Sequence, residues 1–166
     1  SFEAPSSSAP RKQSEKETSA EVMCRRRIAV VGGGAMGSLF AGQLSAVDTY
    51  KVTVVSHWAE HVDAVNQQGL HVHEMDNKSQ QNLLTKRTDN ISAISATAIG
   101  GTHECGADVV FILAKSRDTR QAAETAKRLV KAGGAVVTIQ NGIGCEDAVK
   151  SVFASCDDVL LSFGIT

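Results

Sequence analysis

Three glycines with the spacing G-x-G-x-x-G mark the part of the sequence best suited to chemistry: Gly32, Gly34 and Gly37. They follow an apolar segment at 27–31 and precede a segment with helical spacing of apolar residues. In such a turn the first glycine permits a sharp bend, the second lets the backbone approach a pyrophosphate, and the third lets the helix pack on the sheet. The turn therefore predicts a dinucleotide site at a helix N-terminus, whose free N–H groups attract phosphates. A structural turn without a ligand is the alternative. The candidate binding residues here are Gly32, Gly33, Gly34, Ala35, Met36 and Gly37.

The end of the second apolar segment, 52–55, is where a dinucleotide domain contacts the adenosine ribose. An Asp or Glu there would bond the 2′-hydroxyl of NAD, but this sequence has Ser56, His57 and Trp58, and no acid before Glu60. The missing carboxylate favours NADP over NAD, although the arginine expected for a 2′-phosphate is missing too. Ser56 can donate a hydrogen bond, His57 can add a partial charge, and Trp58 could stack on adenine. A solvent-exposed loop without these roles explains the same residues equally well.

Two further polar positions end apolar segments. Lys115 follows the segment 108–114, and Gln140 and Asn141 follow the segment 135–139. In a doubly wound sheet the carboxyl ends of parallel strands meet at one edge, and ligands bind there. A lone lysine is most often a solvated surface charge, but two such endings beside a dinucleotide turn favour a shared site.

The elements that must position these residues alternate between strand and helix. Strands are expected at 27–31, 52–55, 70–73, 108–114, 135–139 and 159–163, with another within 91–99; helices at 35–47, 59–68, 119–131 and 146–153; and a hairpin or loop at 74–90. Gly133 and Gly134 are expected to stop the third helix. The pattern predicts an α/β, Rossmann-type, doubly wound and mainly parallel sheet with helices on both faces.

Residues 1–25 are polar and rich in serine, and they predict a disordered or expression-derived tail before a dinucleotide-binding domain at 26–166. The formal net charge of −1 gives no basic field for nucleic acid. No apolar run is long enough for a membrane span. The four cysteines and five histidines lack metal-ligand spacing, so we expect no metal and reduced thiols in a cytoplasmic protein. The cysteines are Cys24, Cys105, Cys145 and Cys156.

The sequence resembles the ketopantoate reductase (2-dehydropantoate 2-reductase) family in four segments: 32–37, 60–70, 107–119 and 140–144. The resemblance implies an NADP-dependent oxidoreductase of pantothenate biosynthesis that reduces a 2-oxo acid, ketopantoate, to a 2-hydroxy acid. It also implies that Lys115 and Asn141 position nicotinamide and substrate, and that His57 stands where the family has its 2′-phosphate arginine.

The same resemblance implies what this chain does not include. The family's second, helical domain carries the catalytic lysine, so no catalytic residue is expected within 26–166 and the chain alone should be inactive. A homodimer is possible for the full-length protein. The alternatives are another Rossmann dehydrogenase of a hydroxy acid or sugar acid, and a nucleotide-sensing module without catalysis.

Overall fold

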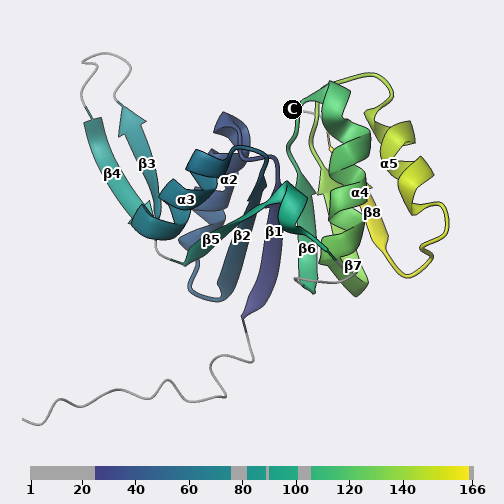
Figure 1. Ribbon diagram of the computed structural model, residues 1–166, viewed down its shortest axis with the longest axis horizontal. Helices are drawn as coiled ribbons and strands as arrows, with labels where there is room; N and C mark the ends of the chain where they lie inside the picture. The colour runs from purple at the N-terminus through teal and green to yellow at the C-terminus, as the bar shows by residue number, and fades with distance from the viewer. Residues whose placement is uncertain (1–24, 76–81, 89, 101–105, 165–166) are drawn as a thin grey trace, which may run out of the picture.

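A computed structural model describes residues 25–75, 82–88, 90–100 and 106–164. Its centre is a six-stranded sheet in which every strand runs parallel to its neighbours (Figure 1). In spatial order the strands are β5 (Ile91–Ser95), β2 (Tyr50–Ser56), β1 (Arg26–Val31), β6 (Ala107–Ile112), β7 (Val130–Thr138) and β8 (Leu160–Phe163). The helices are α2 (Ala35–Ser45), α3 (Ala59–Gln68), α4 (Thr119–Leu129) and α5 (Cys145–Phe153), with 3-10 turns η1 (Ala96–Ala98) and η2 (Ser116–Asp118).

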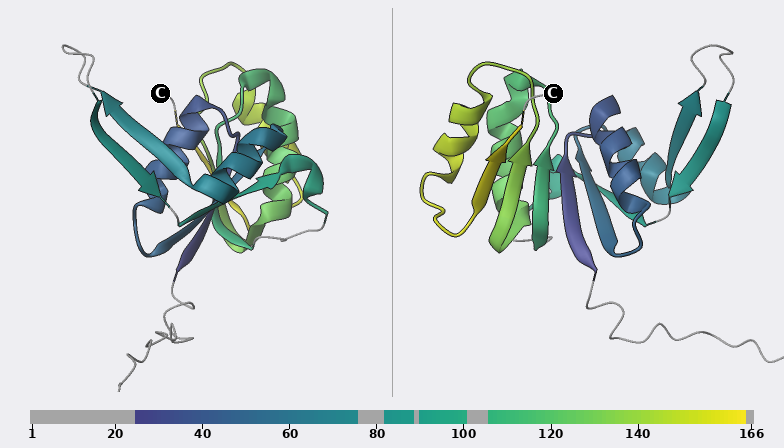
Figure 2. Two further views of the ribbon diagram at one scale, coloured as in Figure 1. Left: turned by 60° about the vertical axis from the view of Figure 1, so that its left-hand side comes forward. Right: turned by 180° about the vertical axis from the view of Figure 1, so that it is seen from behind.

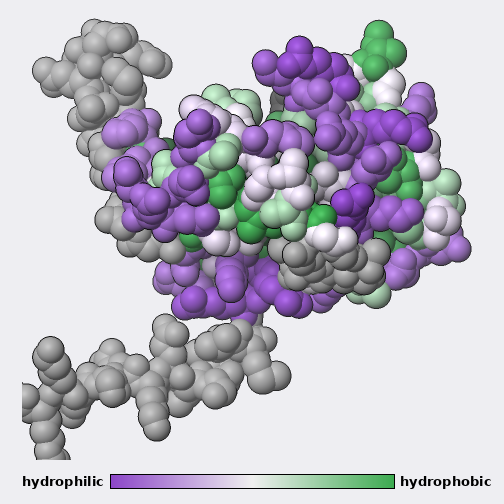
Figure 3. Space-filling model, viewed as in Figure 1, coloured by the Kyte–Doolittle hydropathy of each residue, from purple (hydrophilic) through white to green (hydrophobic). Residues whose placement is uncertain are grey.

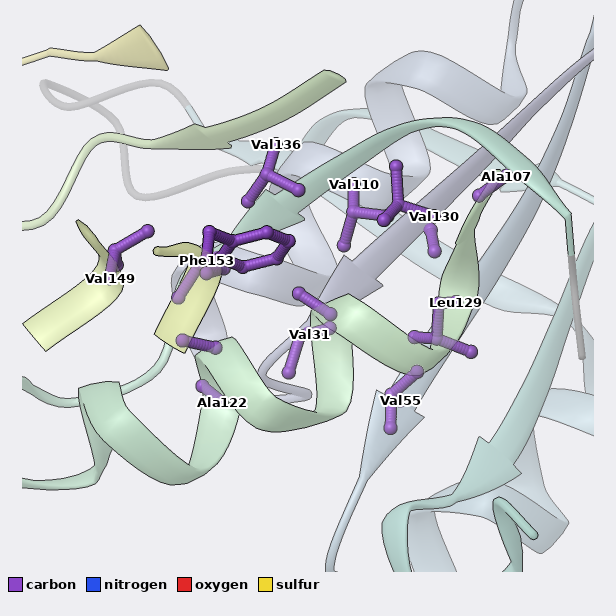
Figure 4. Packing of buried hydrophobic residues seen from close by; sticks show 14 of the residues in the cluster. Val31, Val55, Ala107, Val110, Ala122, Leu129, Val130, Val136, Val149 and Phe153 are labelled. Carbon is purple, nitrogen blue, oxygen red and sulfur yellow. The ribbon is translucent and has the colours of Figure 1, made fainter. Parts of the chain in front are cut away.

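Both faces of the sheet are buried, as the apolar strands require. Side chains alternate between the faces: Ile28 and Val30 of β1 pack with α2 and α3, whereas Ala29 and Val31 pack with α4 and α5. Figure 4 shows the second of these layers, in which Leu129 of α4 and other helix residues contact the strands. The strand order reverses direction between β1 and β6, which is the switch point where doubly wound sheets bind ligands. The predicted fold class is confirmed.

A separate hairpin pairs β3 (Leu70–Met75), which begins where a strand was expected at 70–73, with β4 (Asn82–Thr88), which lies in the stretch 74–90 where a hairpin or loop was expected. It lies at the opposite end of the molecule from α5 and β8 (Figures 1 and 2). The hairpin packs closely on α2, because a Cβ on Gly42 would lie 2.5 Å from Cγ2 of Val72. This contact fixes the outer side of the helix that begins at the glycine turn.

The boundary between α4 and β7 differs from the sequence prediction. The helix ends at Leu129, and β7 begins at once with Val130, which pairs with Ala107 of β6. Gly133 and Gly134 therefore lie inside the strand and do not stop the helix, so that prediction was wrong. Pairing with a buried neighbouring strand outweighs the local preference of glycine.

The amino ends of three strands are joined through Asp108. Its carboxylate accepts a hydrogen bond from the backbone N–H of Arg27 in β1 (2.7 Å) and another from Nζ of Lys131 in β7. The Lys131 ammonium in particular holds the pKa of the Asp108 carboxyl below its usual value. This ionic contact is at the edge of the sheet opposite the glycine turn, so it stabilises the scaffold rather than the site.

The remaining expectations fall partly outside the described residues. Of the predicted tail only Arg25 is described, and Cys24 and Cys105 are also outside. Cys145 and Cys156 are free thiols. Among the described helices, none has the length and apolar character needed to cross a membrane.

Candidate functional site at the carboxyl edge of the sheet

The glycine turn begins where β1 lies between β2 and β6. Gly32 has φ 120°, and a Cβ there would lie 2.7 Å from the carbonyl carbon of Leu113 and 2.8 Å from the nitrogen of Ala114. Its own N–H donates to the carbonyl of Val55 at 3.0 Å. Both the backbone angle and the packing therefore require glycine at this position.

Gly37, one turn into α2, packs against the same turn. A Cβ there would lie only 1.7 Å from the carbonyl oxygen of Gly32 and 3.6 Å from Cγ1 of Val30. The third glycine thus permits close packing, as predicted, but its tightest contact is with the turn itself and not with the sheet.

Gly34 differs from both neighbours in the motif. It caps α2 with an ordinary extended backbone (φ −78°, ψ −175°), and a Cβ there would meet no atom of the described residues within 4 Å. Within the first turn of α2 there is no acidic residue, and none of the described side chains caps the helix. The helix N-terminus therefore faces open space with free N–H donors, an arrangement that fits a pyrophosphate.

The loop after β2 lies beside Gly33. Ser56 is buried, and its Oγ accepts a hydrogen bond from the N–H of Trp58 at 3.1 Å. A Cβ on Gly33 would lie 2.8 Å from that oxygen. His57 and Trp58 are exposed, Trp58 with 60% of its surface accessible. Ser56 therefore holds the loop against the turn, while His57 and Trp58 are the residues presented to solvent.

His61 contacts the same loop, and the sequence analysis did not identify it as a candidate site residue. Its ring stacks on Trp58 at 5.7 Å between centroids, and its Nε2 lies 3.4 Å from Oγ of Ser38 on α2. Its place in the site depends on contacts between α3, α2 and the loop before α3, which local spacing does not contain.

Elsewhere on the carboxyl edge, the segments that carry Lys115 and Asn141 meet. Lys115 is the exposed N-cap residue of η2, three residues after β6 ends at Ile112. The next residue, Ser116, donates from Oγ to the carbonyl oxygen of Asn141 at 2.8 Å. Gly142 closes the contact, because a Cβ there would lie 2.7 Å from the same Oγ. The structure thus places the two predicted residues on adjoining, bonded segments.

The Gln140 side chain joins the ends of the neighbouring strands by hydrogen bonds. Its Nε2 donates to the carbonyl of Ala114 at 2.6 Å, and its Oε1 accepts from Oγ1 of Thr138 at 2.9 Å. Oγ1 of Thr119 lies 3.3 Å from the same Oε1. The amide is therefore engaged in joining the ends of β6 and β7 to the start of α4.

Thr119 is the buried centre of that connection, with 2% of its surface exposed. Its hydroxyl donates to the carbonyl of Ser116 at 2.8 Å and lies 3.5 Å from Sγ of Cys145, the first residue of α5. Thr119 ends the Lys-x-x-x-Thr sequence that begins at Lys115, and its contacts explain that spacing. It holds η2, and with it Lys115, against α5 and β7.

Thr119→Val tests this connection. The substitution keeps the shape but removes the hydroxyl, and we expect the free energy of unfolding to fall by about 1–3 kcal/mol because buried polar partners lose their hydrogen bond. Thr125→Val on the same helix is the control, since among the described residues the Thr125 hydroxyl bonds the exposed carbonyl of Gln121. The free energy of unfolding of this variant should change by no more than about 0.5 kcal/mol. Urea denaturation measures both, and equal effects would show that the Thr119 hydroxyl has no structural role.

Two exposed apolar side chains lie in the segments that carry the candidate site residues. Met36 at the start of α2 is 60% exposed, and Ile143 in the turn before α5 is fully exposed. In the view of Figure 3 the surface is mainly hydrophilic, with smaller apolar areas between. Apolar side chains beside free helix N–H groups suit a ligand that carries both rings and phosphates.

The sheet order and the glycine turn at its switch point define a Rossmann-like dinucleotide-binding domain of the kind found in dehydrogenases. The chain belongs to the ketopantoate reductase family: the family model described as "Ketopantoate reductase PanE/ApbA" matches residues 28–164. It is a ketopantoate reductase-like NAD(P)-binding domain within an oxidoreductase family. The resemblance inferred from the four sequence segments is confirmed.

Curated relatives carry the same name. The 2-dehydropantoate 2-reductase of Halobacterium salinarum is 34% identical over 135 residues, which are 81% of this chain and 40% of that protein. The 2-dehydropantoate 2-reductase of Lactococcus lactis is 27% identical over 124 residues, 75% of this chain and 36% of that protein. The chain thus spans about two fifths of the length of these relatives.

Solved structures agree on the fold. A PanE/ApbA family ketopantoate reductase from Ralstonia eutropha superposes with a TM-score of 0.58 at 26% identity, over 84% of this chain and 39% of that one. A D-mandelate dehydrogenase solved with NADH and anilino(oxo)acetate gives a TM-score of 0.61 at 24% identity, over 81% of this chain and 39% of that one. The second likeness indicates shared architecture only.

Proposed function

We propose that this chain is the NADP(H)-binding domain of an oxidoreductase that reduces a 2-oxo acid, ketopantoate in the family reaction, to a 2-hydroxy acid. The observation that carries the proposal is the open space over Gly34 at the N-terminus of α2. There the backbone N–H groups of the turn and helix would hold the pyrophosphate, as the other two glycines fix the turn in place. When bound, the cofactor supplies the hydride, and the protein binds and orients it.

In this proposal Lys115 and Asn141 act at the nicotinamide end of the bound cofactor. Their segments adjoin across the Ser116 hydrogen bond, at the carboxyl ends of β6 and β7. A lysine ammonium donates hydrogen bonds and favours the charge that develops on a carbonyl oxygen during reduction. The reaction as a whole belongs to a longer protein with a second domain, and we expect no turnover from residues 26–166 alone.

Lys115→Ala should weaken the binding of NADPH more than the binding of 2′,5′-ADP, because 2′,5′-ADP lacks the nicotinamide half. We expect a loss of about threefold to tenfold for NADPH, since one charged donor is removed, and less than about twofold for 2′,5′-ADP on the same scale. Lys51→Ala is the control, because Lys51 is exposed near the amino end of β2. Calorimetry measures the affinity of the wild type and of both variants for each ligand. Equal losses of affinity for both ligands would show that Lys115 does not act at the nicotinamide end of the cofactor.

NADP should be preferred over NAD by a modest margin. The loop after β2 presents His57 and no carboxylate before Glu60, so nothing in it repels a 2′-phosphate. An imidazole N–H can donate a hydrogen bond to that phosphate. His57→Ala should therefore lower NADPH affinity more than NADH affinity, as measured by calorimetry.

His57→Arg provides the complementary test at pH 8. A guanidinium binds phosphate with two charge-assisted hydrogen bonds and stays charged at that pH. We expect NADPH affinity to increase about tenfold, with NADH affinity nearly unchanged. Equal losses of NADPH and NADH affinity in His57→Ala, together with no gain in His57→Arg, would show that His57 does not contact the phosphate.

A further inference from the structure

His61 lies against the glycine turn although it comes from a different element. A Cβ built on Gly33 would lie 3.2 Å from Cδ2 of the His61 ring, so the imidazole is in contact distance of the turn backbone. The residue is partly buried in the first turn of α3. Its ring therefore forms part of the wall beside the turn.

Two contacts fix how that ring is oriented. Trp58 stacks on it with the planes 17° apart, and Oγ of Ser38 lies 3.4 Å from its Nε2. The Ser38 hydroxyl is in turn 3.4 Å from the carbonyl oxygen of Gly33. Nε2 thus lies beside α2 and Cδ2 beside the turn, so the ring is positioned before any ligand arrives, while Nδ1 bonds none of the described residues.

The place occupied by His61 is the ribose end of the site. In dinucleotide-binding folds the end of the second strand reads the ribose 2′ position, and here that strand end is Ser56. The same Gly33 Cβ would meet Ser56 at 2.7 Å and His61 at 3.2 Å. Since Ser56 is buried and bonded to the Trp58 backbone, His61 is the partly exposed polar side chain at this position.

The surrounding groups agree with an anionic ligand. The helix that His61 faces through Ser38 has no acidic residue within its first turn, and its N-terminus carries partial positive charge. The acids on α3 itself are Glu60 and Asp63, both exposed. His57 is exposed in the loop that precedes α3.

We propose that His61 is a second cofactor-reading residue, which binds the 2′-phosphate of NADP(H) together with His57. This inference rests on the proposed function. It adds a residue that stands away from the strand end and is held by Trp58 and Ser38. The ligand group it recognises is a phosphate monoester on an adenosine ribose, so the residue contributes to the choice between NADP and NAD.

The test compares ligands that differ only in the 2′-phosphate. For His61→Ala we expect NADPH affinity to fall about tenfold at pH 6.5 and NADH affinity to change less than about twofold, because only NADPH loses a charged hydrogen bond. The pair 2′,5′-ADP and 5′-AMP should repeat the pattern. Gln67→Ala, exposed at the end of α3, is the control and should change neither.

The outcomes separate the inference from the function on which it rests. Equal losses of NADPH and NADH affinity would show that His61 has a structural role only. Unchanged affinities would show that His61 does not contact the cofactor. Either result overturns the inference. His61→Gln retains a hydrogen-bonding side chain, so it replaces His61→Ala should that variant fail to fold, and it should show a smaller but still NADPH-selective loss. A wild-type chain that binds neither cofactor would instead contradict the proposed function.

Discussion

Gly34→Val is expected to abolish useful cofactor binding while leaving the fold intact. The added side chain would occupy the open space over the N-terminus of α2, where the pyrophosphate must approach the backbone. The loss of two charge-assisted hydrogen bonds there should lower the affinity for NADPH at least about 100-fold. Because Gly34 has an ordinary extended backbone and no neighbour within 4 Å among the described residues, valine should fit without strain.

Gly100→Val is the matched control for that experiment. A Cβ on Gly100 also meets no described atom within 4 Å, but Gly100 follows Ile99, whose carbonyl bonds Arg128 near the end of α4. The control should bind NADPH like the wild type, as measured by calorimetry, with circular dichroism confirming both folds. Unchanged affinity in a folded Gly34→Val protein would make the glycine turn a structural feature only.

Gly37→Ala is expected to destabilise the domain strongly, although it adds a single methyl group. That methyl would lie 1.7 Å from the carbonyl oxygen of Gly32, so the start of α2 must move away from the turn. We expect a loss of about 3 kcal/mol or more in the free energy of unfolding. In thermal denaturation this corresponds to a fall of roughly 10 °C in Tm.

Gly34→Ala makes the same chemical change three residues earlier and should alter stability by no more than about 0.5 kcal/mol, since its site is open. The contrast between the two alanines separates the packing glycine from the ligand-facing one. Similar Tm values for both variants would mean that the turn relaxes easily and that Gly37 does not fix it.

Much of the fold could be predicted from periodicity. The elements around the turn could be predicted because each buries one face on a neighbour. They follow from the apolar segments at 27–31 and 52–55 and from the helical spacing at 59–68. The end of α4 could not be predicted in this way. Gly133 and Gly134 are typical of the end of a helix. Because Val130 pairs with Ala107, however, both glycines lie within β7. Such pairing joins residues distant in the sequence, which a local pattern does not contain.

The candidate site was predictable to a similar extent. The glycine turn, Lys115 and Asn141 follow from strand ends, since parallel strands bring their carboxyl ends to one edge. His61 and the Thr119 connection do not follow from the sequence, because both depend on contacts between elements. His61 reaches Ser38 across two elements, and Thr119 joins the segments of Ser116 and Gln140. Local spacing gives no information on either.

The central claim is that the cofactor binds at the open N-terminus of α2, and a ¹H–¹⁵N NMR titration of the labelled chain with NADPH tests it most directly. We expect saturable, one-to-one changes that are largest at the backbone amides of Gly34, Ala35 and Met36. A smaller set should appear at His57 and His61 and be weaker with NADH. Absence of saturable changes, or changes centred on the amino edge of the sheet around Asp108, would contradict the account.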